Sequence, residues 1–166
     1  MILNILKKIY RRSIGYYKWT LFRIAKNGLL NTISPRLRPW IWKISGVNIN
    51  GKISIGYDVY YDVSNAKLIH IEDGVWIASR ALLLCHKRIL NDYCIGDDYN
   101  KLPYQKNKIY LKKGCVIGMG TIVMPGVTIG EGAIIGAGSV VVKDIPAWTI
   151  AVGNPCKVVK ELKERE

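Results

Sequence analysis

The chain contains two histidines, His70 and His86, whose neutral imidazole rings could accept a proton near pH 7. His70 lies between Ile69 and Ile71, so strand alternation points it outward and favours a surface or packing role. His86 is the fourth residue of a six-residue unit that begins at Leu83, and a long insertion leaves the repeat there. His86 is therefore the better candidate for catalysis; its alternative is a polar corner residue that tolerates unusual φ.

The cysteines Cys85, Cys94, Cys115 and Cys156 show no paired CxxC spacing, which zinc and redox motifs usually have. The first residues carry their charges after the apolar residues and lack the hydrophobic region of a secretory signal. We therefore expect reduced thiols in a cytoplasmic protein, and no metal site.

A six-residue repeat occupies residues 111–144. Its first position is aliphatic in every copy: Leu111, Ile117, Val123, Ile129, Ile135 and Val141. Its fourth position is glycine in all but the last copy: Gly114, Gly120, Gly126, Gly132 and Gly138. The aliphatic side chains would stack inward, and each glycine would take a positive φ that other residues adopt only at a cost. Each unit therefore predicts a short strand followed by a tight corner.

Stacked copies of this unit must share one core, because a single unit cannot bury its apolar face alone. Three corners close a triangle, so one coil needs about eighteen residues and roughly four coils fit within residues 47–146. Residues 61–70 and 84–110 interrupt the count. The uncharged run Gly114–Gly130 is rich in glycine and contains Pro125, which argues against a transmembrane helix.

The pattern divides the chain into three segments. Residues 1–46 form a basic amphipathic N-terminal segment, residues 47–146 form the coils with a protruding loop at 86–110, and residues 147–166 form a C-terminal tail. In the tail, Asn154 and Pro155 fit an N-cap followed by proline at the first helical position, so we expect a short C-terminal helix.

The repeat, together with the closing segments 135–146 and 152–157, resembles the hexapeptide-repeat acyltransferases over about residues 47–160. The resemblance implies an all-β fold, a left-handed parallel β-helix, to which the expected terminal helices and the loop after His86 are added. Handedness rests on the resemblance alone, because the general rule for parallel crossovers gives the opposite hand. The pattern is most similar to sugar and polysaccharide O-acetyltransferases, which work as homotrimers with sites between neighbouring subunits.

The activity implied by the resemblance is transfer of acetyl from acetyl-CoA to a hydroxyl of a sugar or surface glycan. Residues 78–86 are similar to the family segment that ends in the catalytic histidine, which makes His86 the general base. An exposed backbone N–H near Gly118 and Met119 would stabilise the oxyanion. In a trimer, His86 and this donor can belong to different chains.

Coenzyme A would lie along the last coils, where cationic side chains suit its phosphates. Met119 and Ala137 match the family's backbone-contact positions, and Lys143 and Lys160 match its phosphate-side positions. Lys157 lies close by, and Gly118 completes the expected cofactor-binding set. Val142 stands where the family often has threonine, which removes one hydroxyl contact. For each lysine, a solvated surface charge is an equally good interpretation.

For the acceptor, Asp62 matches a family position that orients the sugar, and the aromatic ring of Tyr61 would suit a sugar face. Tyrosine and aspartate at a corner are also ordinary surface residues. Cys85, beside His86, is not expected to be a nucleophile, because the thioester of acetyl-CoA is already activated.

The net charge of +13 is concentrated at the N-terminus, where residues 1–57 contain eleven Lys or Arg and no acid. Plotted as a helix, residues 1–18 have one apolar side and one cationic side. Such a helix can lie on an anionic membrane at the inner face, or it can pack on the first coil or on a neighbouring subunit. Nucleic acid is not expected as a partner, because no recognised binding module is present.

Two other functions remain open. An N-acetyltransferase acting on an amino sugar would use the same donor and a similar base, and a non-catalytic β-helix could serve as a structural trimer. A zinc carbonic anhydrase on this fold is disfavoured, because it needs three histidine ligands and the chain has two histidines.

Overall fold

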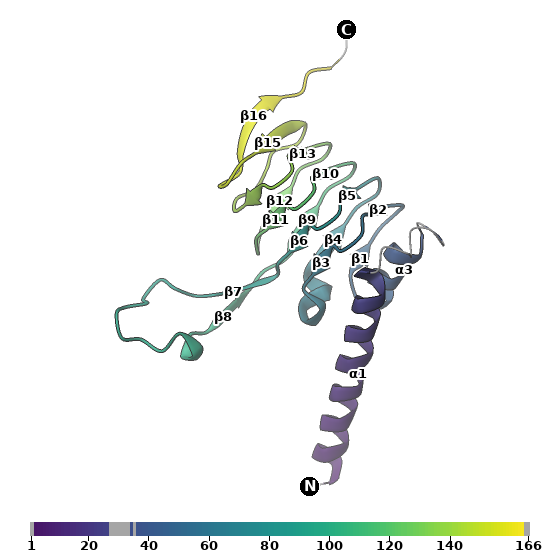
Figure 1. Cartoon of the computed structure of the whole chain (residues 1–166), viewed down its shortest axis with the longest axis vertical. Coiled ribbons are helices and arrows are strands. Elements are labelled where there is room, and N and C mark those ends of the chain that lie inside the picture. Colours follow the sequence, from purple (N-terminus) through teal and green to yellow (C-terminus); the bar gives the residue numbers. More distant parts are fainter. Residues whose placement is uncertain (1, 27–33, 35, 165–166) are drawn as a thin grey trace.

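The computed structural model of the chain describes residues 2–26, 34 and 36–164. Its body is a column of stacked β-coils, from which helix α1 (Ile2–Lys26) projects at the N-terminal end and a two-stranded arm projects sideways (Figure 1). The parts of the predicted terminal segments at residues 1, 27–33, 35 and 165–166 lie outside the described residues.

Three parallel sheets form the three faces of the column. Face 1 contains β1 (Asn48–Ile49), β4 (Ile69–Ile71), β9 (Ile109–Leu111) and β12 (Thr128–Ile129). Face 2 contains β2 (Ser54–Ile55), β5 (Trp76–Ile77), β10 (Val116–Ile117), β13 (Ile134–Ile135) and β15 (Thr149–Val152), with β16 (Lys157–Glu161) at its edge. Face 3 contains β3 (Tyr60–Tyr61), β6 (Leu82–Leu83), β11 (Ile122–Val123) and β14 (Val140–Val141). The chain visits the faces in turn, so each coil contributes one strand to each face.

The six-residue repeat builds this column as its pattern predicts. The second residue of each two-residue strand in the column points inward, and Ile117, Val123 and Ile135 are at most 1% exposed. The glycines at the fourth position have positive φ, for example +68° at Gly120 and +69° at Gly138. Backbone hydrogen bonds then join equivalent residues of adjacent coils, which keeps the register constant. The predicted strand-and-corner unit is confirmed.

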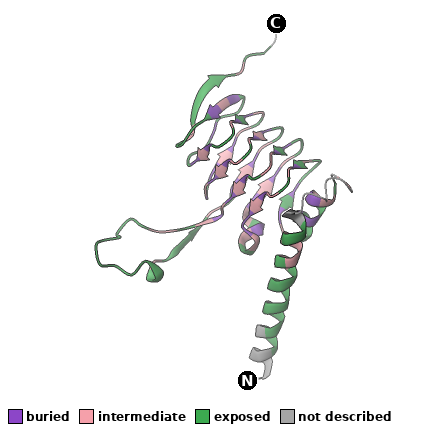
Figure 2. Cartoon of the chain, in the orientation of Figure 1, coloured by how far each residue is buried: buried purple, intermediate pink, exposed green. Residues whose placement is uncertain are grey.

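Two helical elements cover the open N-terminal end of the column. Helix α3 (Leu37–Ile44) buries Ile41 and Trp42 against the first coil. Its Arg38, 1% exposed, donates a 2.7 Å hydrogen bond from Nη1 to the carbonyl oxygen of Ile55. The last turns of α1 add Leu21 and Phe22 to the same cluster, whereas most of α1 is exposed (Figure 2).

The two predicted interruptions are ordered structures. The first contains the 3-10 helix η1 (Val63–Leu68). The second is an antiparallel arm of β7 (His86–Arg88) and β8 (Tyr104–Lys106), with the 3-10 helix η2 (Tyr99–Lys101) in its connecting loop. Both leave the column after face 3, which brings their bases together.

The expected C-terminal helix is wrong. After a cis Asn154–Pro155 bond the chain forms β16, which pairs antiparallel with β15. The last parallel strand leaves a row of backbone groups open to pairing, and the β-branched Val158 and Val159 favour an extended strand there. Edge pairing therefore overrides the local helix signal.

Candidate active site

His86 and Asp62 form a hydrogen-bonded pair at the face-3 edge of the column. Register pairs Tyr61 with Leu83, so the residues that follow these strands lie side by side. A hydrogen bond joins Nδ1 of His86 to Oδ2 of Asp62. Because an ionised carboxylate only accepts, Nδ1 carries the proton and Nε2 keeps its lone pair. The pair therefore leaves His86 with one nitrogen able to act as a base.

The carboxylate of Asp62 is held by a second partner. Asp62 is 2% exposed and caps η1, where its side chain accepts hydrogen bonds from the backbone N (3.3 Å) and Nδ2 (2.8 Å) of Asn65. The His86 side chain, in contrast, is 38% exposed. A buried carboxylate thus orients a ring that solvent and ligands can reach.

The base of the arm contacts the other side of the imidazole. The ring of Tyr104 meets the His86 ring edge-on, with centroids 5.3 Å apart. Arg88 lies over the Tyr104 ring at 3.9 Å and donates hydrogen bonds to the carbonyls of Asn100 and Leu102. These contacts fix Tyr104, and with it the ring of His86.

A groove of about 500 Å³ opens beside the pair. Its walls include the aromatic residues Trp19, Phe22, Tyr60 and Tyr104, while His86 also lines it. Aromatic rings beside hydrogen-bonding groups suit a ligand with both apolar and polar faces, such as a sugar ring.

The two predicted acceptor residues have different surroundings. Tyr61 is fully buried between Trp42 and Phe22, so it offers no surface to an acceptor, and the partly buried Tyr60 lines the groove instead. Tyr61 lies six residues after Ile55, the inward position of the repeat, and this spacing could have revealed its burial. Asp62 lines the groove, but its hydrogen bonds go to His86 and Asn65.

Four of the predicted cofactor residues share one corner of the column. Gly118 and Met119 follow face 2 one coil before Ala137, and the N–H of Gly138 donates to the carbonyl of Met119 at 2.8 Å. Lys157 pairs with Val152, the last residue of β15 on face 2. This corner therefore offers exposed backbone next to an exposed cation.

The other two lysines lie elsewhere. Lys160 pairs with Ile150 on face 2. Lys143 follows face 3 after β14, at the corner from which His86 leaves after β6. Two coil steps separate β6 from β14, which corresponds to about 10 Å along the column. A single chain therefore does not bring all six residues together.

His86 and the predicted oxyanion donor also lie at different corners. Gly118 and Met119 come before β11 of face 3, whereas His86 comes after β6 of the same face. The N–H of Gly118 donates to Ile135 at 2.9 Å, so within this segment the N–H of Met119 is the candidate donor.

The remaining candidate residues do not join the site. Cys85 is fully buried, and burial together with the charge of Asp62 raises the pKa of its thiol to about 12. His70 lies on face 1, where its ring stacks on Tyr110 at 4.8 Å. Burial, followed by the charges of nearby lysines, lowers the pKa of His70. His70 is thus a packing residue in this structure.

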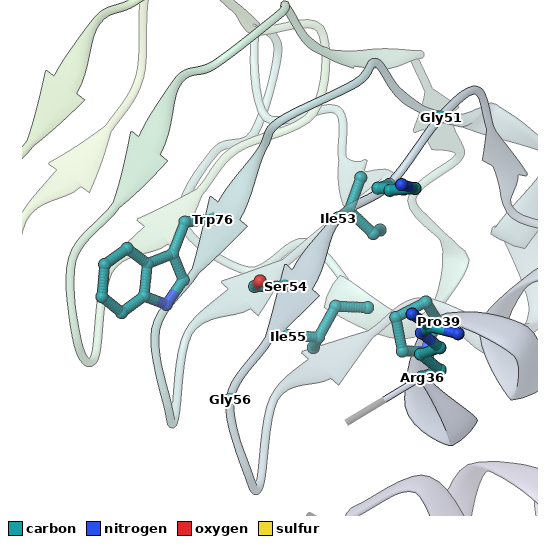
Figure 3. A pocket seen from close by; sticks show the side chains of 9 residues that line it. Arg36, Pro39, Gly51, Ile53, Ser54, Ile55, Gly56 and Trp76 are labelled. Atoms are coloured by element: carbon teal, nitrogen blue, oxygen red, sulfur yellow. The ribbon is translucent and has the colours of Figure 1, made fainter. Parts of the chain in front are cut away.

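A second cavity, of about 880 Å³, lies beside the first coil (Figure 3). Trp76 stands on one side of it, and Arg36 and Pro39 at the start of α3 stand on the other. Among the described residues that line it there is no His, Cys, Asp or Glu, so they supply no group for proton transfer near neutral pH. The groove at His86 is therefore the better active-site candidate.

Within the described part of the chain, no three His, Cys, Asp or Glu residues are arranged to hold a metal ion. No described helix is long and apolar enough to cross a membrane.

Comparison with known proteins gives the repeat its family. Residues 108–143 match the family model described as bacterial transferase hexapeptide (six repeats). This stretch is a hexapeptide-transferase repeat. The chain is similar to the galactoside O-acetyltransferase of Lactococcus lactis, at 42% identity over 71 residues, 43% of this chain and 31% of that protein. The chain spans about a third or less of the curated relatives it matches.

Solved structures extend the similarity to most of the chain. A maltose O-acetyltransferase from Clostridium difficile 630 covers 90% of this chain and 86% of its own, with a TM-score of 0.67 and 26% identity. AntD, an N-acyltransferase from Bacillus cereus solved with dTDP and 3-hydroxybutyryl-CoA, covers 69% of this chain and 65% of its own, with a TM-score of 0.57 and 26% identity. The predicted left-handed parallel β-helix is confirmed.

Proposed function

We propose that this hexapeptide-repeat protein is an acetyltransferase that moves acetyl from acetyl-CoA to a hydroxyl of a sugar or surface glycan. The observation that carries the proposal is the Asp62–His86 pair at the mouth of an aromatic-lined groove. The acetyltransferase relatives and the neighbour solved with an acyl-CoA support the donor, and the sugar-modifying relatives support the acceptor. The proposal includes a role in polysaccharide biosynthesis in the cytoplasm.

In the reaction, Nε2 of His86 takes the proton of the acceptor hydroxyl as its oxygen attacks the thioester carbonyl. The new C–O bond forms a tetrahedral intermediate, whose oxyanion accepts a hydrogen bond from a backbone N–H. The C–S bond then breaks, and the coenzyme A thiolate leaves and takes the proton from the imidazolium. Asp62 stabilises that imidazolium through Nδ1 and does not transfer a proton itself.

The separation of His86 from Met119 supports a homotrimer with shared sites. The His86 corner and the Met119 corner border the same face of the column, so in a symmetric trimer a neighbouring subunit can present its Met119 corner, with Gly118, Ala137 and Lys157, to the groove at His86. Lys143 and Lys160 then remain candidates for the phosphate groups. The acceptor contact predicted for Asp62 stays a prediction beside its role as the partner of His86.

Transfer to an amine is the second candidate, because AntD is an N-acyltransferase. The test is to incubate the full chain with acetyl-CoA and a panel of sugars and glycans, while measuring thiol release and product mass. An ester product is cleaved by mild base, whereas an amide survives. An acetyl ester supports the proposal, a stable amide favours the second candidate, and the absence of any acetylated product contradicts both in favour of a structural trimer.

A further inference from the structure

Helix α1 carries an apolar face that none of the residues described by the structure covers. Leu6, Ile9, Tyr10, Tyr17 and Ile24 fall on one side at 100° per residue, and each is 45–66% exposed. The helix projects from the end of the column, so this face stays clear of the coils (Figures 1 and 2). An exposed apolar strip of this length is typical of a binding surface.

Only the C-terminal end of α1 packs on the column. There Leu21, at the edge of the strip, and Phe22, on the opposite side of the helix, pack on the core of the first coil. The expected packing on the first coil is thus present only in the last turns, and a different contact has to account for the apolar face.

Cations border the apolar face on both sides. Arg12 and Arg23 lie along one border and Lys7 and Lys18 along the other, at 100° per residue. Residues 1–57 contain no acidic residue that could pair with them. Two copies of α1 packed face to face would bring these like charges together, whereas an anionic lipid surface complements them and buries the apolar strip.

The same helix forms a wall of the candidate active site. Trp19 and Phe22 line the groove at His86, and Arg23 lies over the Trp19 ring at 5.0 Å. Phe22 lies on the side of α1 opposite the apolar strip. If the strip rests on a bilayer, the groove stands about one helix diameter, roughly 10 Å, above the lipid surface.

We propose that α1 lies flat on an anionic bilayer and that the groove accepts saccharides carried on lipids of that bilayer. The proposal of a docking surface depends only on the features of α1, whereas the choice of acceptor rests on the proposed function. A saccharide linked to a lipid headgroup extends far enough to reach a groove at that height, while its lipid holds it next to the helix.

The docking test uses the full chain with vesicles of phosphatidylcholine alone or mixed with phosphatidylglycerol. We expect co-sedimentation with the anionic vesicles only, and release at high salt. In the double variant Lys7→Gln with Arg12→Gln, each lost cation should weaken binding about fivefold, so about 25-fold in total. The matched control, Lys113→Gln with Lys163→Gln, removes the same charge from exposed sites on the column and on the C-terminal tail and should bind like the unmodified chain.

The apolar strip is tested by Ile9→Ser with Tyr17→Ser, which should lose vesicle binding and keep its oligomeric state in native mass spectrometry. Equal binding to both kinds of vesicle, or undiminished binding by the Lys7 and Arg12 variant, would overturn the docking surface. Dissociation of the oligomer by the serine variant, with vesicle binding unchanged, would instead make this strip an interface between copies.

The acceptor is tested with two probes, hexadecyl maltoside held in anionic vesicles and methyl maltoside in solution. We expect the Lys7 and Arg12 variant to acetylate the soluble probe at the unmodified rate and the vesicle-held probe at least tenfold more slowly. If the variant acetylates both probes at the rate of the unmodified chain, the proposal of a lipid-linked acceptor is overturned. If neither probe is acetylated while vesicle binding persists, the proposed function fails for this acceptor class and the docking surface stands.

Discussion

Replacing Asp62 with Asn separates the charge of the Asp62–His86 pair from its shape. Asparagine caps a helical turn about as well as aspartate, so η1 and the thermal unfolding midpoint should change little. A hydrogen bond to a charged group contributes about 1.5–3 kcal/mol, and this one strengthens when His86 becomes an imidazolium. At about 1.36 kcal/mol per factor of ten, its loss lowers kcat about 10- to 150-fold.

The largest loss in kcat expected for Asp62→Asn depends on the tautomer of His86. If the new amide donates to Nδ1, the ring proton moves to Nε2 and the base is lost, which lowers kcat by roughly 10²–10⁴-fold. Nitrogen NMR shifts of His86 report which ring nitrogen carries the proton, and a purely structural role for Asp62 would not move them. The KM for acetyl-CoA should change little, because Asp62 is 2% exposed and its hydrogen bonds go to His86 and Asn65.

Steady-state kinetics by thiol release, with the acceptor found in the sugar screen, measures the result. Asn65→Ala is the matched control, because it removes a 2.8 Å hydrogen bond to the same carboxylate and leaves the pair with His86. It should cost less than about tenfold in kcat. A kcat for Asp62→Asn within twofold of the unmodified protein would refute the role of the pair.

Three further predictions concern the core, the thiols and the shared site. Ile135→Ala removes a buried, stacked side chain and should destabilise the fold by about 2–5 kcal/mol in denaturant unfolding; a loss below about 1 kcal/mol would contradict the stacked core. At pH 8 a thiol reagent should label the exposed Cys94 quickly and leave Cys85 unlabelled, because burial holds the Cys85 pKa near 12; equal labelling rates would contradict this. Inactive His86→Ala and Met119→Pro chains should regain turnover when co-expressed, since mixed trimers contain intact sites; no recovery in mixed trimers would rule out a site shared between subunits.

The coils were predictable because each position of the repeat has one physical role. Aliphatic residues every six positions and glycines three residues later fix inward packing and the positive-φ corners, so four coils follow from residues 47–146. The burial of Tyr61 was not predicted, because the count of six-residue units stopped at the first interruption, residues 61–70. Carried one unit further from Ile55, the count assigns Tyr61 to the core and Tyr60 to the surface.

The site was only partly predictable, because its members meet across coils. His86 could be chosen from its corner position, but its contact with Asp62 depends on the pairing of Tyr61 with Leu83 across an interruption of uncertain length. The six-residue spacing of Ala137 and Lys143 does predict that they lie at neighbouring corners. The strand β16 was not predictable from local residues, because its partner is the open edge left by β15.

The central claim, that His86 is the general base, is tested most directly by the turnover of His86→Ala with acetyl-CoA and the identified acceptor. The side chain lies at a corner outside the core, so folding, oligomeric state and coenzyme A affinity should barely change. His70→Ala, on face 1, is the control and should keep near-normal activity. We predict a loss of roughly 10²–10⁴-fold in kcat for His86→Ala, the contribution of one positioned acid–base group. Acetylation by His86→Ala at the rate of the unmodified protein would contradict the account.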